Sequence, residues 1–115
     1  MIITNNPTTA SAYPALSQYH KADVMHIFTT VRDAIHMGAK LISHPLSGSI
    51  KPNISPYKSV LIAAGETLDF KSLQIIEDAI NVLERLPKKQ HGYSESVLQD
   101  FRVIDLDLIR SSINV

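Results

Sequence analysis

The amino-acid sequence predicts an α/β fold: a small single-domain, layered sheet of three to five short, mostly parallel strands with helices on both faces. Amphipathic helical segments alternate with short apolar segments along the chain. The apolar run at residues 59–63 is continuous rather than alternating, which is typical of a strand buried on both sides. With 115 residues, of which 44% are hydrophobic and 19% charged, residues 1–115 are expected to form one globular domain.

The first strand is expected at residues 1–4, which are mostly apolar and include β-branched side chains. The side chain of Asn6 suits an N-cap, and Pro7 suits the first position of a helix. Because Pro14 would break that helix, we expect it to be short. A second short strand is expected near residues 18–20.

The clearest helix is expected at residues 24–37. Its apolar side chains recur at helical spacing, with Asp23 as a credible N-cap and Gly38 just past the C-terminus. The stripe consists of Val24, Ile27, Phe28, Val31 and Ile35. A strand at residues 39–43 follows, and the His44-Pro45 pair ends it because proline holds the preceding residue extended.

The second half of the chain is expected to continue the same pattern. After the strand at residues 59–63, Asp69 caps a helix that Pro87 ends, and a polar turn at residues 88–92 follows. We expect one helical turn at residues 94–99 and a strand at residues 101–104. Asp105 would then cap a last short helix.

Composition excludes several classes of protein. Without cysteine the chain has no disulfide and no thiolate metal site. Its 11 basic and 11 acidic residues cancel, so no general attraction to nucleic acid is expected. No apolar run approaches the roughly 20 residues of a membrane span, and the N-terminus lacks the features of a signal peptide. We therefore expect a cytoplasmic protein that binds neither nucleic acid nor membrane.

The segment at residues 44–58 is where the sequence predicts recognition. No acidic residue lies between Asp33 and Glu66, whereas this segment carries Lys51, Lys58 and several hydroxyl groups. Ligands of α/β sheets bind beyond the carboxyl ends of strands, and the first strand also ends in polar residues. The expected ligand is a small phosphate or carboxylate anion. The candidate binding residues are Asn5, Asn6, His44, Ser47, Gly48, Ser49, Lys51, Asn53, Tyr57 and Lys58. A loop that forms only ordinary surface structure is the competing interpretation.

An enzyme remains an alternative, with His44 as general acid or base on a phosphorylated or carboxylate substrate. No catalytic residue is assigned, because the chain lacks a nucleophile-elbow motif. No cofactor is expected. His26 and His36 lie nearly three helical turns apart, and the other histidines are isolated in sequence, so no metal site is expected either.

Several blocks of the sequence together resemble the GrdX family. The longest is Leu41-Ile42-Ser43-His44-Pro45-Leu46-Ser47-Gly48-Ser49-Ile50-Lys51-Pro52-Asn53, and the others are residues 2–7, 31–38, 56–59 and 104–107. The resemblance implies a cytoplasmic accessory protein linked to the glycine reductase gene cluster of amino-acid-fermenting bacteria, with a protein partner in that system. It implies no reaction and no catalytic residue. A homo-oligomer that uses the 44–58 loop as its interface is a further alternative.

Overall fold

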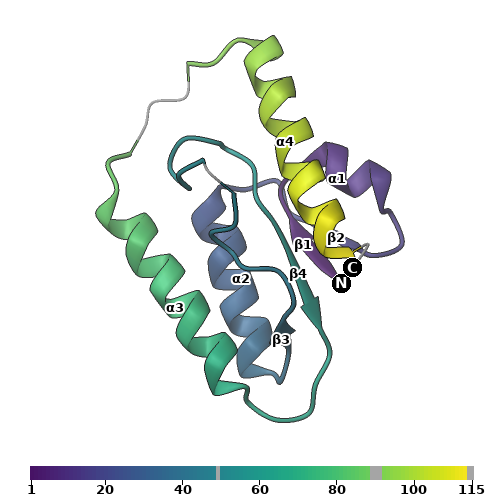
Figure 1. Cartoon of the computed structure of the whole chain (residues 1–115), viewed down its shortest axis with the longest axis vertical. Coiled ribbons are helices and arrows are strands. Elements are labelled where there is room, and N and C mark those ends of the chain that lie inside the picture. Colours follow the sequence, from purple (N-terminus) through teal and green to yellow (C-terminus); the bar gives the residue numbers. More distant parts are fainter. Residues whose placement is uncertain (49, 89–91, 114–115) are drawn as a thin grey trace.

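The computed structural model describes residues 1–48, 50–88 and 92–113 of the chain. They form a small α/β structure in which four strands and four helices are described (Figure 1). The elements in chain order are β1 (Ile2–Thr4), α1 (Pro7–Ala12), β2 (Ser17–Tyr19), α2 (Val24–His36), β3 (Lys40–Leu41), β4 (Ser59–Ala63), α3 (Phe70–Arg85) and α4 (Glu95–Ile113). No helix in the described ranges has the length and apolar character that crossing a bilayer requires.

The sheet is mixed, so the expectation of mostly parallel strands is wrong. Its strand order is β2-β1-β4-β3, with β1 parallel to β2 and β4 antiparallel to both of its neighbours. Parallel pairing of consecutive strands needs a long crossover, usually a helix. The segment between β3 and β4 contains no helix, and it returns the chain so that Ile62 pairs with Leu41 in the opposite direction.

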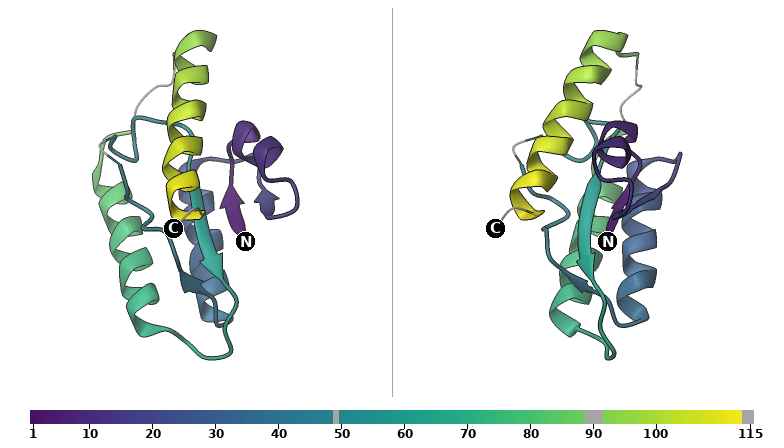
Figure 2. Two further views of the ribbon diagram at one scale, coloured as in Figure 1. Left: turned by 45° about the vertical axis from the view of Figure 1, so that its right-hand side comes forward. Right: turned by 90° about the vertical axis from the view of Figure 1, so that its right-hand side faces the viewer.

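Alternate residues of β1 and β4 contact different helices. Ile3, Val60 and Ile62 belong to an apolar cluster with residues of α2 and α3. Ile2 belongs to a second cluster with buried residues of α4, and Leu61 packs against it. Figure 2 shows α2 and α4 on opposite sides of β4. The apolar side chains of β4 therefore pack against helices on both faces of the sheet.

The predicted caps of α2 and α3 are confirmed. Asp23 accepts a hydrogen bond from the His26 amide at 2.8 Å, and Asp69 accepts one from the Ser72 amide at 3.2 Å. Gly38 adopts a φ of 104°, the left-handed conformation expected just after a helix. A Cβ on Gly38 would lie 2.5 Å from the carbonyl oxygen of Gly65, so this turn also needs a residue without a side chain.

The strand predicted at residues 101–104 and the N-cap predicted at Asp105 are both wrong. The single helix α4 runs through them, and Asp105 lies in its interior. The β-branched pair within residues 101–104 favours a strand only locally, whereas Asp105, Leu106 and Ile109 are buried together on one helical face. The strand predicted at residues 39–43 is shorter, Lys40–Leu41. The polar turn predicted at residues 88–92 lies mostly outside the described residues.

Candidate functional site

Asn5 holds three separate segments together at the end of β1. Its side-chain amide donates to the carbonyl oxygens of Ala22 and Pro56, both at 2.8 Å, and its side-chain oxygen accepts from the Lys58 amide at 2.8 Å. The residue is buried. These contacts fix the end of the 44–58 loop next to the start of α2, and they occupy the polar atoms of the Asn5 side chain.

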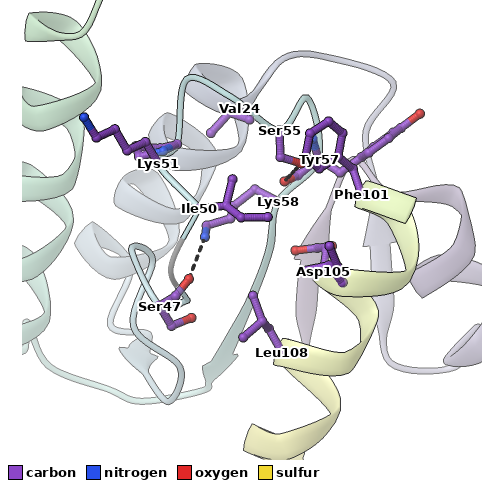
Figure 3. A pocket seen from close by; sticks show the side chains of 12 residues that line it. Val24, Ser47, Ile50, Lys51, Ser55, Tyr57, Lys58, Phe101, Asp105 and Leu108 are labelled. Atoms are coloured by element: carbon purple, nitrogen blue, oxygen red, sulfur yellow. Dashed lines mark hydrogen bonds between the residues drawn. The ribbon is translucent and has the colours of Figure 1, made fainter. Parts of the chain in front are cut away.

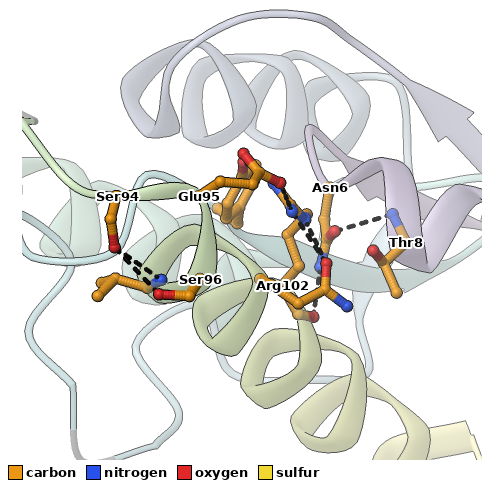
Figure 4. A network of polar contacts seen from close by, with 9 residues as sticks. Asn6, Thr8, Ser94, Glu95, Ser96 and Arg102 are labelled. Carbon is orange, nitrogen blue, oxygen red and sulfur yellow. Dashed lines mark hydrogen bonds and ion pairs between the residues drawn. The ribbon is translucent and has the colours of Figure 1, made fainter.

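Asn6 connects β1 and α1 to α4 (Figure 4). Its Nδ2 donates to Asp105 Oδ2 and to the Arg102 carbonyl oxygen, both at 2.9 Å, while its Oδ1 caps α1 at the Thr8 amide. The Asp105 carboxylate also accepts from the Ser59 hydroxyl at 2.6 Å and from the Ser59 amide at 3.0 Å. Asp105 is thus a buried carboxylate surrounded by neutral donors, which stabilise its charge.

Between the 44–58 loop and α4 lies a cleft, which we call the loop–α4 cleft (Figure 3). It encloses a cavity of about 20 Å³, and its enclosed part therefore has room for about one water molecule. Polar lining residues come mostly from the loop, and half of the apolar ones come from α4. The lining consists of Val24, Ser47, Ile50, Lys51, Pro52, Ser55, Tyr57, Lys58, Phe101, Ile104, Asp105 and Leu108.

Lys58 carries the positive charge in the inner part of the cleft. Its ammonium group donates to the Ser47 carbonyl oxygen at 3.5 Å, which is a long hydrogen bond. Within the described ranges, the ion pairs at up to 4.0 Å join other residues and leave Lys58 without a carboxylate partner. Burial lowers the pKa of Lys58 below its usual value, and the attraction of Asp105 offsets part of that effect.

The tip of the loop touches α4 at Gly48. This glycine has a φ of 95°, in the left-handed region, and a Cβ built on it would lie 2.8 Å from Leu108 Cδ1. The backbone conformation therefore favours glycine at this position, whereas the close approach is to the end of a flexible leucine side chain. The contact therefore joins the loop to Leu108, which lines the loop–α4 cleft.

The predicted binding residues do not form one group. Ser47, Lys51, Tyr57 and Lys58 line the loop–α4 cleft, and Gly48 lies against Leu108, another lining residue. The other predicted residues, Asn5, Asn6, His44 and Asn53, are not among its lining residues, and Ser49 lies outside the described residues.

His44 and Asn53 make contacts that fix the loop itself. His44 is exposed, and its Nδ1 accepts from the Leu46 amide at 3.0 Å, which holds the ring in a turn. Asn53 donates to the Pro87 carbonyl oxygen at 2.9 Å and lines a separate groove of about 700 Å³. That groove lies between the start of α2, the loop and the end of α3.

Sequence reasoning missed the contribution of α4 to the cleft. Apolar residues recur at positions i, i+4, i+7 and i+11, namely Val97, Phe101, Ile104 and Leu108. The strand predicted at residues 101–104 interrupts this helical pattern, so the pattern was not recognised. That helical spacing was the signal that could have found it. Arg102 was missed as well: it donates to the Tyr57 hydroxyl at 2.9 Å and pairs with Glu95.

The structure also brings together two histidines that are six positions apart. His26 Nε2 lies 3.3 Å from His20 Nδ1. No group of three or more potential metal ligands occurs in the part of the chain that the structure describes.

Comparison with known proteins places the whole arrangement in one family. The model of the GrdX-like protein family matches residues 1–114. The chain belongs to the GrdX-like family. No curated protein and no solved structure matches it. The match confirms the resemblance seen in the sequence, and it includes both the 44–58 loop and α4 of this GrdX-like chain.

Proposed function

We propose that this GrdX-like protein is a non-enzymatic binding module that holds a small carboxylate or phosphate anion in the loop–α4 cleft. The observation that carries the proposal is the half-buried ammonium group of Lys58, which has one long hydrogen bond and no ion-pair partner within the described ranges. A cation without a partner in a partly apolar cleft is unfavourable, and an anion bound there would remove that cost.

The neighbouring groups support an anion at this position. Ser47 contributes a hydroxyl group to the lining, and Lys51 adds an exposed positive charge, whereas the Ser55 hydroxyl donates to the Tyr57 carbonyl oxygen. The Asn5 contacts hold Lys58 in place through its backbone amide, so the ammonium group extends from a fixed point. A preorganised cation of this kind loses little conformational entropy when a ligand binds.

The cellular role that we propose follows from family membership. A GrdX-like protein would act as a cytoplasmic accessory protein beside the glycine reductase system, with a protein partner there. The enzyme alternative, with His44 as acid or base, receives less support, because His44 is not among the residues that line the cleft and its Nδ1 is engaged in a turn.

Isothermal titration calorimetry at pH 7 with sodium acetate and sodium phosphate tests the proposal. We expect the wild-type chain to bind at least one of them and Lys58→Met to weaken that binding at least tenfold, because the counter-charge is lost. Lys71→Met is the matched control, since Lys71 is exposed on α3. Absence of saturable heat with either anion, or equal binding by Lys58→Met, would contradict the proposal.

A further inference from the structure

We infer that the loop–α4 cleft selects short aliphatic monocarboxylates over phosphate. The inference rests on the proposed function, because it names the class of anion that the same site would bind. It follows from three properties of the cleft: its opposed walls, its charge and its size.

The two walls of the cleft differ in chemistry. Phe101, Ile104 and Leu108 of α4 form an apolar wall, and Ile50 of the loop lies beside the Lys58 side chain (Figure 3). Ile104 is 40% exposed, so it has apolar surface available for a ligand to cover. A ligand with an anionic end and a hydrocarbon end matches both walls, whereas phosphate would place desolvated oxygens against hydrocarbon.

The charge of the cleft suits a single negative charge. The ammonium group of Lys58 has three N–H donors, of which one points to the Ser47 carbonyl oxygen. Two donors are left for the two oxygens of a carboxylate. The charged residues of the lining are Lys51, Lys58 and Asp105, and their net charge of +1 matches one negative charge on a ligand.

The size of the cavity also favours a carboxylate. The enclosed space of about 20 Å³ has room for about one ligand atom, such as one carboxylate oxygen, and the rest of the ligand must lie on the open side of the cleft. A carboxylate is planar and can enter a narrow cleft edge-on. Phosphate is tetrahedral and presents oxygens in every direction.

The test is a calorimetric comparison at pH 7 of acetate, propionate and butyrate with inorganic phosphate. We expect propionate to bind at least tenfold more tightly than phosphate. Each added methylene should tighten binding by up to about fourfold, which is the value of a fully buried methylene. Ile104→Ser should abolish that chain-length increment while acetate still binds. Val103→Ser is the matched control, because Val103 is 41% exposed on α4 but does not line the cleft.

The outcomes separate this inference from the proposal on which it rests. If phosphate binds as tightly as propionate, and Lys58→Met abolishes that binding, the preference for monocarboxylates is wrong and the anion site stands. An unchanged chain-length increment in Ile104→Ser would also overturn the inference. If none of the four anions binds, both the inference and the proposed function fall.

Discussion

Burial disfavours the charged form of Lys58, so the free energy of unfolding should depend on pH in the alkaline range. The pKa of Lys58 in the folded chain is lowered from 10.5, mainly by burial. Between the folded-state pKa and 10.5, the unfolded chain therefore binds more protons than the folded chain. Stability should rise with pH across that window, and Lys58→Met should lack this contribution. Urea unfolding at several alkaline pH values measures how the free energy of unfolding changes with pH in the wild type and in Lys58→Met. An identical pH dependence in the two proteins would contradict a lowered pKa at Lys58.

Asn5 illustrates the opposite situation, a polar residue whose groups are all satisfied. Asn5→Ala should lower the free energy of unfolding by about 2–4 kcal/mol, because two carbonyl groups and the Lys58 amide lose their partner in a partly buried setting. Asn53→Ala is the control: it removes one exposed hydrogen bond and should cost no more than about 1 kcal/mol. Denaturant unfolding of both variants checks the difference. Equal losses would show that Asn5 does not act as a clamp.

At the scale of single elements, α4 is held against the sheet by Asp105. Asp105→Asn should destabilise the fold by about 2–4 kcal/mol, because an amide replaces one of the two acceptor oxygens that Asn6 and Ser59 contact. Asp107→Asn is the matched control, since Asp107 is exposed on the same helix. Thermal unfolding followed by circular dichroism measures both changes. A loss below about 1 kcal/mol for Asp105→Asn would contradict the role given to this network.

The helix α4 also shows which elements can be predicted from sequence. Helices α2 and α3 have clear caps and apolar stripes, so local chemistry is enough to locate them. Helix α4 buries an aspartate in its inner face, and the binary pattern of the sequence cannot show the donors from β4 and α1 that make this burial tolerable. The helix-free segment before β4 already favours its antiparallel pairing with β3, whereas its antiparallel pairing with β1 joins strands that are far apart in the sequence and was missed.

At the scale of the whole molecule, the 44–58 loop and α4 meet although 36 residues separate them in the sequence. Gly48→Ala should cost about 1–3 kcal/mol, because the new Cβ strains the backbone and meets Leu108. A double-mutant cycle with Leu108→Ala should recover the part of that cost due to the clash. Additive losses would indicate that the loop tip does not contact α4 in solution.

Of the two walls of the loop–α4 cleft, only the one formed by the loop could be predicted from the sequence. The lysines and hydroxyl groups of the loop were visible in the sequence, whereas Phe101 and Ile104 of the apolar wall lie in the part of α4 that was predicted as a strand. Asn5 and Asn6 were expected to face a ligand, yet their hydrogen bonds lie within the protein. Polar residues that connect distant segments and polar residues that bind ligands look alike in a sequence without an alignment.

The most direct test of the central claim is an amide NMR titration of the ¹⁵N-labelled chain with propionate. A small anion held at Lys58 predicts saturable shifts at Ser47, Ile50, Lys58 and Leu108, and none at these positions in Lys58→Met. Shifts that do not saturate, or that centre on the groove beside Leu83 and Pro87, would contradict the account.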